Sequence, residues 1–93
     1  MKVIFKIEEG DLSGLRVWDQ FSERLNALVD AGFSEIVIDL GAVRSLSSLA
    51  LGTIVATNQT MASAGRRLVV TNLGKELTRL TVETKLLGVI SIE

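Results

Sequence analysis

The sequence predicts an α/β fold: a single domain over residues 1–93, with a mostly parallel sheet of four to five strands and helices alternating between the strands. Two observations lead to this prediction. A chain of 93 residues is long enough for one hydrophobic core but too short for a second domain. Short apolar, β-branched runs alternate with longer segments of helical periodicity, in the order β-α-β-α-β-α-β, which favours parallel strands joined by right-handed crossovers.

The first strand and the first helix are predicted from a change in the spacing of apolar residues. Every second residue from Val3 to Ile7 is apolar, as in a strand, and residues 10–14 supply the turn chemistry that ends it. From about residue 15 the spacing becomes helical. The inner face of this helix is predicted to consist of Val17 or Trp18, Phe21, Leu25 and Leu28. Gly32 is expected to close the helix in the left-handed conformation.

An uncharged window follows the next strand. Residues 36–40 are mostly β-branched and apolar on both faces, which predicts a central, covered strand. From Ser45 to Gly65 the chain contains no Asp, Glu, Lys or Arg. Most of this window has helical spacing. Its predicted buried face is formed by Leu51, Ile54, Val55, Met61 and Ala62.

The opposite face of this helix is small and uncharged, where an ordinary surface helix would carry lysine and glutamate. It consists of Leu49, Thr53, Ala56, Thr57, Thr60 and Ser63. Because the centres of protein interfaces are depleted of charge, this face suits docking against another protein. Burial of the helix on both sides is the alternative. Membrane insertion is not expected, since residues such as Asn58 and Gln59 would place polar groups in hydrocarbon.

The last third of the chain continues the alternation. Residues 67–71 predict another buried strand, and a short helix is expected through Glu76, Leu77, Leu80 and Thr84. Residues 89–92 predict the final strand. Asp39 stands at a strand end beside a serine-containing loop, which makes it the carboxylate of most interest.

Composition excludes several classes of function. The chain has no cysteine and no histidine, so the commonest metal ligands and general bases are missing and we expect no catalytic residue, no metal and no cofactor. A net charge of −1 with evenly mixed Lys and Glu gives no basic stripe for nucleic acid. The first residues have no long apolar core and no small-residue cleavage site, so a signal peptide is not expected. We therefore expect a cytoplasmic protein that is not an enzyme.

A set of residues in the second half carries a family resemblance. They are Ile38-Asp39-Leu40, Val43, Leu46, Ser47-Ser48, Leu51-Gly52, Ala64-Gly65, Leu68-Val69-Val70, Leu77, Leu80, Leu87, Val89 and Ile90. With them the chain resembles the STAS domain family, whose best-known members are bacterial anti-sigma factor antagonists. The resemblance implies a protein partner, an anti-sigma factor that is also a serine kinase. The sequence stops at Glu93, directly after the predicted last strand, so the family's final helix is expected to be missing. A homodimer or a partner helix would then cover the apolar surface that it leaves.

The phosphorylation motif of the family is altered in this chain. The family carries Asp-Ser-Ser/Thr-Gly between the central strand and its helix, and spacing places these four positions on Ser47, Ser48, Leu49 and Ala50. The usual phosphoacceptor is therefore a leucine. Ser48, and after it Ser47, are the candidate acceptors if the motif is shifted by one residue, with Arg44 as a phosphate contact. The alternative role for either serine is to cap the helix.

Two functional hypotheses follow from the resemblance. In the first, the chain is an anti-sigma factor antagonist in bacterial signalling and transcription regulation. In the second, it is a phosphorylation-independent scaffold or transporter-associated subunit in a stress-signalling assembly or a lipid-transport complex. Both predict a partner-binding surface made of Arg44, Ser45, Ser47, Ser48, Leu49, Thr53, Ala56, Thr57 and Thr60.

Overall fold

The computed structural model describes residues 1–8, 10–12, 14–83 and 91–92. In these described ranges, three helices alternate with the strands of one main sheet, and a pair of two-residue strands lies beside it. The elements in chain order are β1 (Lys2–Lys6), β2 (Asp11–Leu12), α1 (Leu15–Asp30), β3 (Glu35–Asp39), β4 (Ser45–Leu46), α2 (Ser48–Ser63), β5 (Arg67–Thr71), α3 (Lys75–Glu83) and β6 (Ser91–Ile92).

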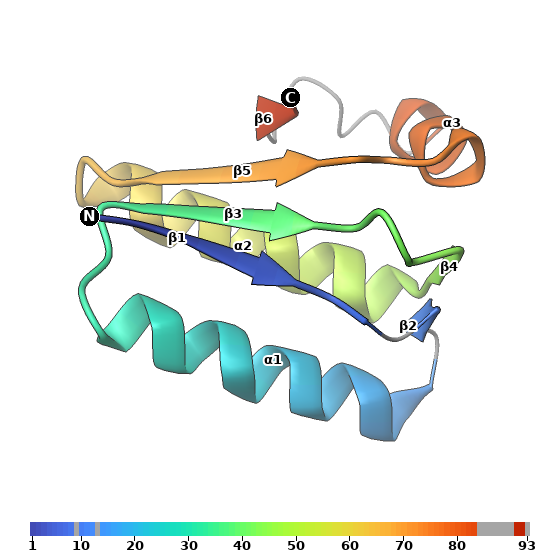
Figure 1. The fold of residues 1–93 in the computed structure, drawn as a ribbon, viewed down its shortest axis with the longest axis horizontal. Coiled ribbons are helices and arrows are strands. Elements are labelled where there is room, and N and C mark those ends of the chain that lie inside the picture. Colours follow the sequence, from blue (N-terminus) through green and yellow to red (C-terminus); the bar gives the residue numbers. More distant parts are fainter. Residues whose placement is uncertain (9, 13, 84–90, 93) are drawn as a thin grey trace.

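The main sheet confirms the predicted fold class. Its four strands in the described part of the chain are all parallel and lie in the order β1-β3-β5-β6. Helices α1 and α2 run side by side along one face of the sheet (Figure 1). Each connects two neighbouring parallel strands, as a βαβ unit requires. The strands therefore all end at the same edge of the sheet, where α1 and α2 begin.

The pairing of β2 with β4 was not predicted. Asp11 lies opposite Ser45 and Leu12 opposite Leu46, in a parallel pair, where the sequence indicated a turn and a loop. The sequence did not predict these strands because two residues are too few to show the alternation of apolar and polar residues that identifies a strand. Leu12 is nonetheless buried in the core, and this contact holds the segment before α2 against the segment before α1.

The core lies between the sheet and the two long helices. Phe21 and Leu25 of α1 are buried as predicted, and the ring of Phe21 stacks on Phe5 of β1 with 5.8 Å between centroids. The remaining residues of the predicted inner face, Val17, Trp18 and Leu28, are half-buried and pack against this core. Gly32 has the predicted left-handed conformation, with φ of 85°, and ends α1.

The predicted inner face of α2 is correct at its centre and wrong at its margins. Leu51, Ile54 and Met61 are buried, but Val55 is half-buried and Ala62 is exposed. Ala50 and Thr57 are buried instead. The physical reason is that a helix without charges has no polar side to mark its orientation, so small residues fit equally well on either margin.

The last helix and strand agree with the prediction as far as they are described. Leu77 is buried at 3% exposure, and β6 pairs with Val69 and Val70 of β5. The predicted positions Thr84, Leu87, Val89 and Ile90, and the side chain of Leu80, lie outside the described part. Among the helices that are described, none combines the length and apolar character needed to cross a membrane.

Candidate functional site

The segment before α2 is held in place by backbone hydrogen bonds. The N–H of Arg44 donates to the carbonyl of Gly10 over 2.7 Å, and the N–H of Ser45 donates to the same carbonyl over 3.3 Å. Val43 is buried, whereas Arg44 and Ser45 are exposed. The segment that contains Arg44, Ser45, Ser47 and Ser48, here called the platform, is therefore held at the edge of the sheet where the strands end. The side chains of Arg44 and Ser45 are directed to solvent.

Ser47 is the N-cap of α2. Its backbone is extended, with φ of −77° and ψ of 162°, and its Oγ accepts a hydrogen bond from the N–H of Ala50 over 3.1 Å. Of the two serines considered for this role, Ser47 is confirmed as the cap. Ser48 is the first residue of the helix and is exposed, so its hydroxyl is the more accessible of the two.

Replacing Ser47 with alanine is expected to lower the free energy of unfolding by about 1 kcal/mol, because the N–H of Ala50 loses its capping oxygen. Ser48→Ala is the matched control and is expected to change stability by less than about 0.5 kcal/mol, since its side chain is exposed. Urea unfolding followed by circular dichroism measures both variants. Equal destabilisation by the two substitutions would contradict the capping role of Ser47.

Two of the three altered motif positions, Leu49 and Ala50, have opposite environments. Leu49, at the position of the usual phosphoacceptor, is 48% exposed, and Ala50, at the position of the glycine, is fully buried. A large apolar side chain is thus displayed beside Ser48 in the first turn of α2. A single exposed leucine is normal for a folded protein, so a role for Leu49 in docking depends on the uncharged face of α2 that it adjoins.

The exposed face of α2 is less polar than its sequence indicates. The hydroxyl of Thr60 donates to the carbonyl of Ala56 over 3.1 Å, and that of Ser63 donates to the carbonyl of Gln59 over 2.9 Å. The Thr53 hydroxyl likewise donates to a carbonyl one turn earlier. Because these donors bond within the helix, the face formed by Leu49, Ala56, Thr60 and Ser63, here called the neutral face, is easily dehydrated.

The structure divides the predicted partner-binding residues of α2. Thr57 is buried, at 7% exposure, so its placement on the exposed face of α2 is wrong: Thr57 lies on the side of α2 that faces α1. Thr53 is half-buried and accepts a hydrogen bond from Nε1 of Trp18 over 2.7 Å. A groove of about 300 Å³ runs between the helices, lined by Ser22, Asn26, Val29, Thr53, Ala56, Thr57 and Thr60.

A polar cluster of Asp39, Gly41 and Asn72 connects the ends of β3 and β5. Oδ1 of Asp39 accepts hydrogen bonds from the N–H of Gly41 over 2.9 Å and from Nδ2 of Asn72 over 3.0 Å. The Asn72 bond, then the Gly41 bond, and the charge of Lys6 hold the pKa of Asp39 below its ordinary value. A Cβ at Gly41 would lie 3.1 Å from Oδ1 of Asp39. The absence of a side chain at Gly41 therefore lets the backbone pass close to the Asp39 carboxylate.

The lowered pKa makes a pH-dependent contribution to stability. Since the pKa is lower in the folded chain than its ordinary value of 3.8, ionised Asp39 stabilises the fold above pH 3.8, and this is lost as the pH falls through the folded pKa. Asn72→Gly should raise the pKa of Asp39 toward 3.8 without backbone strain, because Asn72 has φ of 60°. NMR titration of the Asp39 carboxyl group measures this pKa. An unchanged pKa in the variant would contradict the conclusion that the Asn72 hydrogen bond lowers it.

Comparisons with known proteins agree with this architecture. A family model described as "Mlab, STAS domain" matches residues 9–90. The crystal structure of TM1081, a proposed anti-sigma factor antagonist from Thermotoga maritima, is similar with a TM-score of 0.82 and 19% identity, covering 96% of this chain and 77% of that one. The NMR structure of TM1081 gives a TM-score of 0.83 and 20% identity, covering 99% and 73%. None of the curated proteins compared has a matching sequence.

Proposed function

The chain belongs to the STAS domain family, and from this premise we propose that it is a non-enzymatic interaction module that acts as an anti-sigma factor antagonist. Its partner in this proposal is an anti-sigma factor of the kinase type. The contact surface comprises the platform residues Arg44, Ser45, Ser47 and Ser48 together with the neutral face of α2. The module works in the cytoplasm and has no role in binding nucleic acid.

One observation carries the proposal: the neutral face combines the absence of charge with hydroxyl groups already bonded to the helix backbone. Thr60 and Ser63 each donate to a carbonyl four residues earlier, so docking need not strip water from unbonded donors. Leu49 adds exposed apolar area at one end of the face. Desolvation therefore opposes association less than on a surface helix rich in Lys and Glu.

Phosphorylation of Ser48 would control this surface. The exposed hydroxyl stands in the first turn of α2, where unpaired N–H groups and the helix dipole favour a dianionic phosphate. Arg44, exposed on the platform just before the helix, is the cation that we propose contacts it. The same phosphate would place two negative charges beside Leu49 and thereby oppose docking. The proposed switch therefore releases the partner.

Two observations favour a second candidate function, a phosphorylation-independent scaffold or transporter-associated subunit. Leu49 has no hydroxyl at the position that family members phosphorylate, and the hydroxyl of Ser47 is engaged as the helix cap. In this alternative the docking surface is the same but is permanently active. The partner would then be a component of a transport complex or of a stress-signalling assembly.

The experiment that separates the two functions isolates partners of the native protein and maps its phosphorylation in the same sample. Affinity purification is followed by intact-mass and peptide mass spectrometry. A kinase-type partner together with phosphate on Ser48 or Ser47 supports the antagonist. A transport or scaffold partner with unmodified serines supports the alternative and overturns the switch.

A further inference from the structure

Strand β1 is an edge strand whose outer hydrogen-bonding groups are available. In the described part of the chain β1 is paired with β3 alone. The N–H of Ile7 donates to the carbonyl of Asp39, and a parallel ladder alternates residue by residue. Odd-numbered residues of β1 therefore bond to β3, whereas the N–H and C=O groups of Lys2, Ile4 and Lys6 point away from the sheet.

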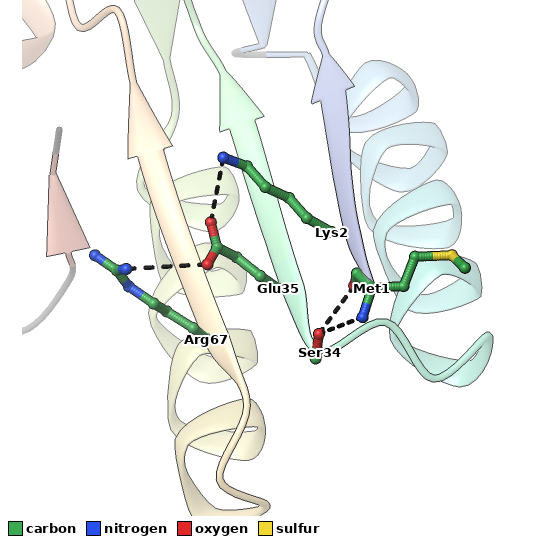
Figure 2. A network of polar contacts seen from close by, with 5 residues as sticks. All are labelled: Met1, Lys2, Ser34, Glu35 and Arg67. Carbon is green, nitrogen blue, oxygen red and sulfur yellow. Dashed lines mark hydrogen bonds and ion pairs between the residues drawn. The ribbon is translucent and has the colours of Figure 1, made fainter.

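The side chains of these three residues lie on the face opposite α1 and α2. Ile4 is 64% exposed, which is high for an isoleucine in a strand, and it stands between two lysines. Lys2 reaches inward across this face to Glu35 on β3, with 3.7 Å between Nζ and Oε2, and Arg67 on β5 contacts the same carboxylate (Figure 2). Glu35 and Asp39, which lie opposite Lys2 and Lys6, belong to the inner strand β3. On β1 itself, the outer strand, the charged side chains are the two lysines, so this edge of the sheet is cationic.

On the helix side a groove follows the same edge. It is lined by Val3, Ile4, Phe5, Lys6, Arg24, Ala27 and Leu28. The guanidinium of Arg24 lies over the ring of Phe5 at 4.9 Å from its centroid, so a third cation borders the edge. A strand added to β1 would place alternate side chains in this apolar groove and beside Ile4.

We propose that the β1 edge binds an extended segment of another protein that carries carboxylates on both sides of an apolar residue, as an added strand of the sheet. Backbone hydrogen bonds to Lys2, Ile4 and Lys6 would supply affinity, and the charges would supply selectivity. This site is separate from the neutral face of α2 and does not depend on the proposed antagonist function.

A second copy of this chain is a poor occupant of the same edge. Antiparallel pairing centred on Ile4 would place Lys2 opposite Lys6 of the other copy, and like charges directly opposite destabilise a strand pair. Lysines on edge strands are known to oppose self-association in this way. An acidic segment meets no such repulsion, so the edge excludes copies of itself and still accepts a complementary strand.

The test uses the intact chain and end-blocked nine-residue peptides of sequence Thr-Thr-Glu-Val-Ile-Val-Glu-Thr-Thr. Centred on Ile4, the two glutamates lie opposite Lys2 and Lys6 in either strand direction. Fluorescence anisotropy at low salt should show binding at least about tenfold tighter than for the peptide with lysines in place of both glutamates. The Lys2→Glu, Lys6→Glu double variant, checked for folding by circular dichroism, should reverse this preference.

A second pair of peptides tests the backbone contact. In an antiparallel added strand centred on Ile4, N-methylation of the central isoleucine removes an N–H that would point to β1, and N-methylation of a neighbouring valine removes one that points away; in a parallel strand these two roles are exchanged. One of the two peptides should therefore bind at least about tenfold more weakly than the other, and which one it is reports the strand direction. Amide shifts in NMR spectra are expected at Lys2, Ile4 and Lys6.

Three results would overturn the proposal. The first is equal or undetectable binding of the glutamate and lysine peptides. The second is equal binding of the two N-methylated peptides, or amide shifts confined to α2. The third is dimerisation of the chain alone that Ile4→Pro abolishes in sedimentation experiments, because this result would assign the edge to a second copy.

Discussion

Replacing Ala56 with arginine is expected to abolish partner binding while leaving the fold intact. Ala56 is exposed on the neutral face of α2, so the fold has room for the longer side chain, and arginine is a good helix former. Against a docked partner, the same guanidinium would be buried without a counter-charge. Such a charge costs about 3–5 kcal/mol, which corresponds to a loss of affinity of roughly 100-fold or more.

The matched control is Ala62→Arg. Ala62 is exposed on the same helix, but the six-residue separation places it on a different side from Ala56. Calorimetric titration with the purified partner should show wild-type affinity for this variant, and thermal unfolding should be similar for both. Binding that survives Ala56→Arg would contradict docking on the neutral face. Thr53→Glu, which the sequence alone also favours, is a poorer probe because Thr53 bonds to Trp18.

Replacing Arg66 with alanine is expected to lower the free energy of unfolding by about 2–4 kcal/mol. Nε of Arg66 donates to the carbonyl of Phe33 over 2.7 Å, and Nη2 donates to the carbonyl of Val29 over 2.9 Å. Both bonds are charge-assisted but only partly buried, so together they contribute less than two fully buried bonds of about 1.5–3 kcal/mol each. Arg66 thereby joins the start of β5 to the end of α1, in a fold whose total stability is about 5–15 kcal/mol.

Arg67 provides a control one residue away. Its guanidinium contacts Glu35 at 3.9 Å on an exposed face, so Arg67→Ala should lower stability by less than about 1 kcal/mol. Arg66→Lys should retain only part of the effect, because an ammonium cannot reproduce the two directed bonds of the guanidinium. Urea unfolding measures all three variants. Similar losses of unfolding free energy for Arg66→Ala and Arg67→Ala would show that the hydrogen bonds from Arg66 to Phe33 and Val29 do not stabilise the fold.

The sequence was most informative where polarity contrasts were strong. In α1, charged residues alternate with Phe21 and Leu25 at helical spacing, and the predicted inner face was correct. The apolar run from Ile36 to Ile38 predicted a covered central strand for the same reason. In α2 the contrast is absent, and Thr57 and Ala62 were placed on the wrong faces. Hydrophobic periodicity can orient a helix only when its two sides differ.

The candidate site shows the same division. The sequence by itself determined that α2 is uncharged, that its first turn lacks the usual hydroxyl at Leu49, and that a serine was available as a cap. Only the tertiary structure decided that Ser47 is that cap, that Thr53 bonds to Trp18 35 positions earlier in the chain, and that Leu12 and Leu46 lie on paired strands. The charge and composition of a segment can be read from consecutive residues. These contacts cannot, because they join segments that become neighbours only when the sheet and helices pack together.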